Sequence, residues 1–166
     1  MSNAPSQILW SIKEIKELEF FVDEFKEIGT TFDYNYLVDL QPVSAEDSIR
    51  WIITVTYMRT DTKEILMKGK IMTVFLIKNL KAMARLNENG TEEVDLPEPF
   101  WVALFSIAYS HARAILAKSS AGTKYGNMLL PPINPTTEFK KLFGHFLKKG
   151  ISESVPVIST PNLPQG

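Results

Sequence analysis

Cysteine is absent from the 166-residue sequence, and histidine occurs only twice. The lack of cysteine excludes a disulfide framework, a thiol nucleophile and a cysteine-ligated metal, and it favours the reducing cytoplasm as the compartment. An excess of charge is also lacking, because 18 basic residues nearly balance 19 acidic ones. No strong field therefore favours nucleic acid as a partner. Residues 1–7 lack a signal-peptide pattern. No apolar run approaches the roughly 20 residues that span a bilayer, so no membrane insertion is expected.

Motifs that carry chemistry are missing as well. The sequence has no HExxH, Walker, GxSxG or GxGxxG pattern. His111 and His145 fall in predicted helices without an acidic residue three or four positions away, which is typical of structural or surface histidines. Asp33 and Asp39 share a strand face with Asn35 between them and could form a carboxylate pair or a metal site, but a solvated outer face explains the same alternation. We therefore expect no catalytic residue, no bound metal and no cofactor.

The N-terminal half shows the period of two that is typical of β-strands. It is clearest in 32–40, where aromatic and aliphatic residues alternate with polar ones. The other predicted strands are 18–22, 49–58 and 64–77, the last two joined by a hairpin turn at 59–63. Sequence order and short links predict an antiparallel meander with one longer excursion at 41–47, whose Pro42 ends the second strand.

The second half changes to helical spacing. No proline occurs between Pro99, which suits a first helical position, and Ser119, and apolar residues cover this segment nearly all round. A helix of that kind packs on more than one side. We expect it to contact its own sheet and another subunit, with an oligomer interface at Leu104, Phe105, Ala108, Ala112 and Ile115. Asn134 is placed to cap a second helix that begins at Pro135 and ends at Gly150.

These elements predict an α+β fold in which a four-stranded antiparallel sheet is followed by a long helix and a C-terminal helix. Residues 1–150 are expected to form a single domain that includes a linker at 78–98. Residues 151–166 contain three prolines and one charged residue and show no period. We therefore expect a disordered tail there.

The strands contain more apolar residues than a sheet covered on one side requires. Residues 49–58 and 71–77 are apolar or neutral on both faces, whereas a sheet with one face in water should alternate. Either oligomerisation buries the second face, or that face forms an apolar groove for a client polypeptide. The two interpretations are compatible with each other.

The order of these elements resembles the SecB family of protein-export chaperones from about Ile12 to Phe143. The best stretch is 111–135 (HARAILAKSSAGTKYGNMLLPPINP). There HAR stands where the family has an aromatic residue followed by Ala-Arg, and a glycine loop and the segment LLPPIN follow at matching places. Upstream, 17–21 (ELEFF) is similar to the motif of the family's first strand.

The resemblance implies a dimer of dimers in the cytoplasm, with long helices sandwiched between pairs of sheets. It also implies an ATP-independent holdase that keeps non-native polypeptides unfolded for export. By position, second-strand residues of this chain match the residues that line the family's client groove. With the neighbouring strand, the predicted groove comprises Phe32, Tyr34, Tyr36, Trp51 and Ile53. The same aromatic residues also suit an ordinary core facing the helix.

The chain departs from the family at the acidic positions that dock the translocase motor SecA. Glu17 keeps the first acid, but Phe21 replaces the second, and Lys68 or Lys70 stands where the fourth strand carries an acid. Reversed charge weakens or redirects an electrostatic docking site. These departures speak against SecA as a partner and favour a divergent chaperone that guards one client, such as a toxin–antitoxin protein.

Two other interpretations remain open at this stage. The chain could be an oligomeric adaptor whose grooves are filled by self-association. It could also be a small-molecule enzyme or carrier whose pocket uses Asp33, Asp39 and the tyrosines of the second strand. Converging carboxylates in a closed pocket would favour the latter.

Overall fold

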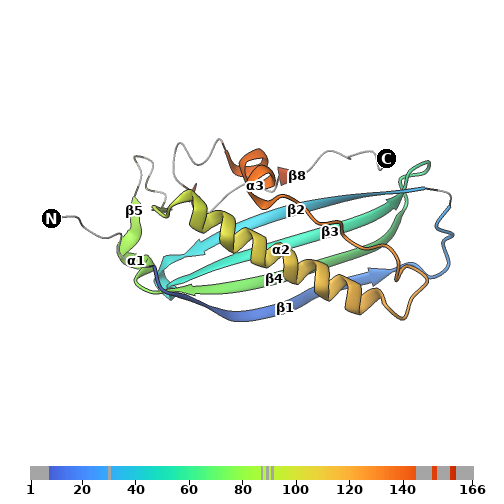
Figure 1. Cartoon of the computed structure of the whole chain (residues 1–166), viewed down its shortest axis with the longest axis horizontal. Helices are drawn as coiled ribbons and strands as arrows, with labels where there is room; N and C mark the ends of the chain where they lie inside the picture. Colours follow the sequence, from blue (N-terminus) through green and yellow to red (C-terminus); the bar gives the residue numbers. More distant parts are fainter. Residues whose placement is uncertain are drawn as a thin grey trace.

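The computed structural model describes residues 8–29, 31–86, 88, 90, 92–144, 151–152 and 158–159. Four long strands form an antiparallel sheet, and one long helix crosses one of its faces diagonally (Figure 1). The strands are β1 (Trp10–Val22), β2 (Phe32–Val43), β3 (Ser48–Arg59) and β4 (Ile65–Ile77). The helices that follow are α2 (Glu98–Ser120) and α3 (Pro135–Phe143). The predicted α+β arrangement is therefore confirmed.

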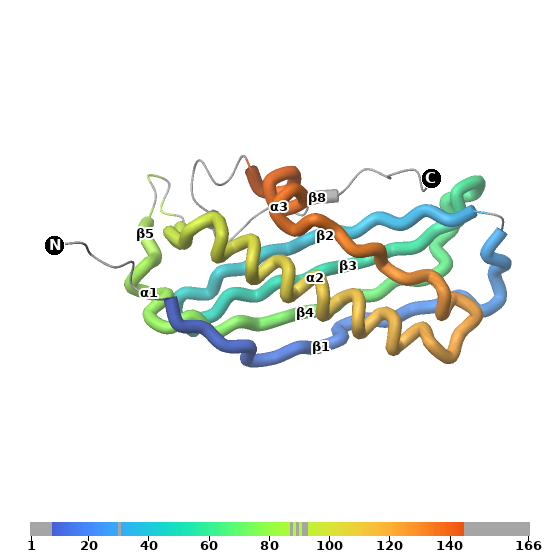
Figure 2. Tube along the Cα trace, viewed as in Figure 1, coloured from blue at the N-terminus to red at the C-terminus, as the bar shows by residue number. Residues whose placement is uncertain are grey.

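The strand order is β1-β4-β3-β2, so the predicted meander is wrong for the first strand. Strand β1 pairs with β4, and the connection after it carries the chain across the end of the sheet to β2, on the far side (Figure 2). Strands β2, β3 and β4 do follow one another as hairpins. Local alternation predicts that a segment is a strand, but it contains no information about which strand lies beside it.

Pro42 does not end β2, contrary to the prediction. The strand continues to Val43, and Pro42 pairs in register with Ile49 of β3. A proline lacks a backbone N–H and is tolerated where no neighbour needs that donor. At this position the described residues place a partner strand on only one side of β2. The excursion at 41–47 is reduced to the short 3-10 helix Ser44–Glu46.

The predicted linker 78–98 contains regular structure. It forms the short helix α1 (Leu80–Met83) and the strands β5 (Ala84–Leu86) and β6 (Glu92–Val94). Strand β7 (Ile151–Ser152) pairs with β6, which makes a second, three-stranded sheet.

Two short parts of the predicted tail are also structured, which differs from the prediction of a disordered segment. Besides β7, the strand β8 (Ile158–Ser159) pairs with β2. The rest of 151–166, with 145–150 and the predicted helix end at Gly150, lies outside the described residues. Helix α3 ends at Phe143, and Asn134 caps it as expected, because its Oδ1 accepts a hydrogen bond of 3.1 Å from the Thr137 amide.

Helix α2 buries one side against the sheet and joins α3 in an aromatic cluster. From the sequence, no apolar run is expected to be long enough to span a bilayer, but the 23 residues of α2 are apolar enough to cross a membrane by length and composition. Here the apolar side packs on the chain's own strands instead. Trp51 of β3 lies at the centre, fully buried, and its ring contacts rings from both helices at centroid distances of 5.6–6.4 Å: Trp101, Phe105, Phe139 and Phe143. Such ring pairs add to the free energy gained by burying their area.

Gly69 allows α2 to approach β4 closely, and this contact gives a test of the packing. A Cβ atom at Gly69 would lie 2.2 Å from Cδ2 of Leu116, a helix residue that is only 2 % exposed. We expect Gly69→Ala to lower the free energy of unfolding by about 1–3 kcal/mol, measured by urea denaturation. Gly122→Ala, with no atom within 4 Å of the new Cβ, is the matched control and should change stability by less than about 0.5 kcal/mol.

The Gly69→Ala effect should also depend on Leu116. If the two side chains clash, Gly69→Ala combined with Leu116→Ala will be less destabilised than the sum of the single variants. Strict additivity would contradict the close approach of α2 to β4.

Candidate peptide-binding surfaces

The first candidate surface is the edge strand β1, which among the described residues pairs along one side only, with β4. Its large apolar side chains stay between 41 and 50 % exposed in the folded chain: Leu9 just before the strand, then Trp10, Ile12, Ile15, Leu18 and Phe21. An exposed edge with apolar side chains is a ready template for another strand, and folded proteins usually blunt or cover such edges. We call these six residues the β1 strip.

A register shift in β1 gathers part of this strip on one face. Between Ile12 and Glu14 the pairing with β4 slips by one residue, as at a β-bulge. Ile12 then pairs with Phe75 and Ile15 with Thr73, both of which are buried on the face that α2 covers. Strict alternation would have put Ile12 and Ile15 on opposite faces.

The helix side that faces β1 continues this apolar surface. Trp10 packs edge-on against Phe75, at a ring-centroid distance of 5.8 Å, and against Phe100 of α2, at 6.5 Å. Farther along α2, Ile107 is half-buried, and His111 contacts β4 through a 3.2 Å hydrogen bond between its Nδ1 and Oγ1 of Thr73. Burial lowers the pKa of His111 below its usual value, which favours the neutral imidazole.

Most of the helix residues predicted as an oligomer interface face the chain's own sheet. Leu104, Phe105, Ala108 and Ala112 are at most 2 % exposed and pack in the core under α2. A second subunit cannot reach them in this conformation, so the interface prediction needs to be moved. Only Ile115 is half-buried and remains within reach. Two apolar helix faces look alike in sequence, and only the position of the sheet distinguishes them.

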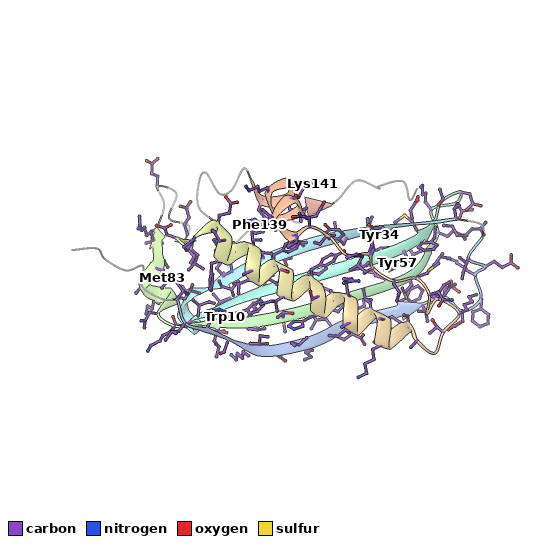
Figure 3. All side chains as sticks on the ribbon, in the orientation of Figure 1. Trp10, Tyr34, Tyr57, Met83, Phe139 and Lys141 are labelled. Atoms are coloured by element: carbon purple, nitrogen blue, oxygen red, sulfur yellow. The ribbon has the colours of Figure 1, made fainter. Side chains whose placement is uncertain are left out.

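The second candidate surface is an aromatic cluster at the other end of the sheet. Phe32 and Tyr34 of β2 are half-buried, and their rings lie 6.1 Å from the ring of Tyr57. Figure 3 shows Tyr34 and Tyr57 at the opposite end of the sheet from Trp10. Among the described residues, the Tyr57 hydroxyl is buried without a hydrogen-bond partner. The other three predicted groove residues, Tyr36, Trp51 and Ile53, are at most 3 % exposed and belong to the core.

Hydrogen bonds from α2 hold the segment between α2 and α3 in place, and Leu129 of this segment is exposed to solvent. Nε of Arg113 donates to the carbonyl oxygen of Leu130, and the Tyr109 hydroxyl donates to that of Pro131, both at 2.8 Å. Met128 and Leu130 are buried, whereas Leu129 between them is 58 % exposed. We call Phe32, Tyr34 and Leu129 the aromatic ledge.

The tyrosines at this end are neutral. Burial raises the pKa of Tyr34, and the negative charge of Glu138 adds to the effect. Burial likewise raises the pKa of Tyr57, although the nearby Arg113 charge opposes it. The surface therefore offers apolar area with uncharged hydroxyl groups, which suits contacts with apolar side chains and backbone amides.

The four residues predicted at the SecA-docking position are divided between the two faces of the sheet. Glu17 faces α2, where it accepts a hydrogen bond from the Ser119 hydroxyl, and a second register shift between Glu17 and Glu19 puts these two residues on opposite faces. Glu19 lies on the outer face and pairs with Lys68 at 3.0 Å. Phe21 pairs in register with Lys68, and Lys70 lies on the same outer face. A continuous acidic docking patch is therefore not present at these positions.

Asp33 and Asp39, which the sequence presents as a candidate enzyme site, do not point towards a common centre. Asp33 accepts from Nζ of Lys63 at 2.6 Å, while Asp39 accepts from Nε2 of Gln41 at 2.7 Å. Each thus has its own local partner. Within the described residues, no group of three or more His, Cys, Asp or Glu side chains could hold a metal ion. His145 lies outside those residues.

Sequence reasoning singled out neither Trp10 of the β1 strip nor Phe25, which is 98 % exposed in the turn after β1. The backbone around it is held by the segment after α2. Nζ of Lys124 donates to the carbonyl oxygen of Glu24 at 2.6 Å, and the Tyr125 hydroxyl donates to that of Lys26 at 2.9 Å. No periodicity in this short turn signals its exposure.

The Asp33–Lys63 pair gives a pH-dependent test. The hydrogen bond from Lys63 holds the pKa of Asp33 below its usual value, so the pair stabilises the fold above that usual pKa and is lost as pH falls through the lowered one. We expect Lys63→Met to raise the Asp33 pKa towards its usual value in an NMR titration of the carboxyl carbons. Lys68→Met, which removes a lysine paired with Glu19, is the control and should leave it unchanged. An unaltered Asp33 pKa in Lys63→Met would contradict the pair.

No family model matches the chain, and no curated protein matches its sequence. Among solved structures, the chain is similar to the SecB-like chaperone Rv1957 of Mycobacterium tuberculosis, in complex with a ChAD peptide from the Rv1956 HigA1 antitoxin. The two are 12 % identical with a TM-score of 0.49, and the match covers 75 % of this chain and 90 % of that one. The motif order of the chain resembles the SecB family, and its structure is similar to a SecB-like chaperone.

Proposed function

We propose that the chain is an ATP-independent chaperone that binds non-native polypeptides as a homo-oligomer in the cytoplasm, without catalysis. The observation that carries the proposal is the amount of apolar surface left exposed by a single folded chain, above all the β1 strip. Contiguous exposed apolar surface usually marks a site of protein–protein interaction. The resemblance of the motif order to SecB supports the same class of function.

The β1 strip fits a second copy of the chain. Two β1 edges can pair antiparallel around a twofold axis, which joins the two four-stranded sheets and satisfies the free backbone groups of both edges. The same contact would cover Trp10, Ile12 and Ile15. Two such dimers meeting over the half-buried sides of α2 would give the dimer of dimers that the sequence resemblance implies.

The aromatic ledge fits the client. Phe32 and Tyr34 are held by the sheet, and Leu129 is held by the segment that Arg113 and Tyr109 fasten. Aromatic side chains on a firm support provide contact area at low cost in conformational entropy. This surface keeps two of the five residues predicted for the groove and replaces the three core residues by Leu129.

A chaperone dedicated to one client is proposed in preference to a general export factor. Glu17 faces the helix, and Phe21, Lys68 and Lys70 occupy the outer face, so the positions expected to dock SecA are not continuous and contain one acidic residue. Antitoxin segments are a first class of client to test, because Rv1957 is bound to such a peptide. An oligomeric adaptor without client binding remains the second candidate, and the β1 strip alone would suffice for it.

Assembly is tested on a matched pair of isoleucines. Ile15 in the β1 strip and Ile65 at the start of β4 are each 42 % exposed. We expect the wild-type protein to elute with a mass of at least twice 18.8 kDa in light scattering, and Ile15→Glu to shift it towards the monomer because a charge would be buried in the pairing. Ile65→Glu should leave the mass unchanged. A monomeric wild-type protein would exclude the proposed assembly.

Client binding is tested on a matched pair of leucines. Leu129 on the aromatic ledge is 58 % exposed, and Leu86 in β5 is 76 % exposed. Without ATP, we expect the wild-type protein to suppress aggregation of a reduced, unfolding client. Leu129→Ser combined with Tyr34→Ser should need roughly five- to tenfold more protein for the same effect, since two apolar contacts are lost.

The control for client binding is Leu86→Ser, which should behave as the wild type. If an oligomeric wild-type protein in molar excess has no effect on aggregation, the adaptor interpretation is favoured over the chaperone.

A further inference from the structure

The sheet has a second edge, along β2, and the chain itself occupies part of it. Strand β8 pairs antiparallel with β2 through two residue pairs, Val38 with Ile158 and Leu37 with Ser159. Figure 1 shows β8 beside α3, above β2. These pairs involve only two of the twelve residues of β2. In the described part of the chain, the rest of this edge has no partner strand.

The sequence around β8 is that of a short strand limited at both ends. Between Pro156 and Pro161 lie only Val157, Ile158, Ser159 and Thr160, three of which are β-branched and favour extended structure. A proline cannot donate to a ladder, so pairing through Pro156 or Pro161 would lack a hydrogen bond wherever β2 needs that donor. The segment can therefore pair with the edge only weakly, although its attachment to the same chain gives it a high effective concentration there.

The edge lies on the strand that also carries two of the three residues of the aromatic ledge. Phe32 and Tyr34 project from one face of β2, while its backbone groups point along the plane of the sheet to the edge. A polypeptide that adds to β2 as a strand would thus lie next to Phe32 and Tyr34. Strand addition is a common way to bind extended peptides, since main-chain hydrogen bonds provide affinity without requiring a particular sequence.

We propose that the free edge of β2 is a strand-addition site, and that the C-terminal segment around Ile158–Ser159 is its resident occupant, which a client has to displace. The segment resembles a client in being extended, nearly uncharged and apolar, but it is held in place by a very short ladder. It keeps an aggregation-prone edge covered while no client is present, and it yields to a longer strand. This inference rests on the proposed client binding only for the displacement step.

The pairing itself is tested in the full-length chain. Ile158→Pro removes a backbone donor and should disrupt β8, whereas Ile158→Val keeps a β-branched residue and is the matched control. We expect at least one of the Leu37 and Val38 amides to exchange its hydrogen faster in Ile158→Pro than in the wild type. In Ile158→Val both amides should exchange at the wild-type rate. Equal exchange in both variants would overturn the resident-strand proposal.

The acceptor role of the edge is tested with a synthetic peptide of residues 151–166. Added to Ile158→Pro protein, it should restore protection at Leu37 or Val38, while the same peptide N-methylated at Ile158 and Ser159 should not. Lack of protection by the unmodified peptide would show that β2 is not a strand-addition site. This readout does not depend on any client.

Displacement is tested with an unfolded client. If the resident strand competes, Ile158→Pro should bind the client about two- to tenfold more tightly than the wild type or Ile158→Val, because a larger fraction of the edge is free. Unchanged or weaker binding would refute competition. If neither protein binds any client while the peptide still protects β2, the proposed function fails and the strand-addition site stands.

Discussion

The diagonal packing of α2 across the sheet is the constraint from which the exposed surfaces follow. Strands of 12 and 13 residues are about 40 Å long, and four of them are about 15–20 Å wide, whereas a helix is only about 10 Å across. One helix therefore covers a diagonal band, in which Gly69 permits the closest approach and Trp51 anchors both α2 and α3. The helix leaves two corners of the inner face uncovered, and only one of them is covered by another part of the described chain.

One corner is closed from within the chain, and the other is not. At the corner next to β2, α3 and the segment before it cover the strands, and hydrogen bonds from Arg113 and Tyr109 hold that segment down. At the corner next to the first half of β1, Trp10 meets Phe100, and no further element of the described chain covers Ile12 and Ile15. Because one helix does not cover the whole inner face, the aromatic ledge forms at one end of the sheet and the β1 strip stays exposed at the other.

The two edges of the sheet differ in the same way. Strand β1 is long and irregular, its exposed apolar side chains lie among charged ones, and its two register shifts determine which side chains face the helix. Strand β2 pairs with β3 along its whole length without a register shift, and the two residues of β8 cover its middle. A protein that binds extended polypeptides has to keep such edges available without letting them aggregate. In the proposed assembly, a second copy of the chain on one edge and a weak resident strand on the other would meet both requirements.

Sequence alone determined the types of the long strands and helices, since period-two alternation in 32–40 and helical spacing after Pro99 depend only on local geometry. It also determined the cap at Asn134 and the absence of cysteine. It did not determine that β1 lies beside β4, that Leu104 and Phe105 face the chain's own sheet, or that Glu17 and Glu19 point to opposite faces. The physical reason is that strand neighbours, the orientation of an all-round apolar helix and a single-residue register shift depend on contacts between residues far apart in the chain. Only the tertiary structure decided these, and with them which apolar residues became core and which remained exposed for binding.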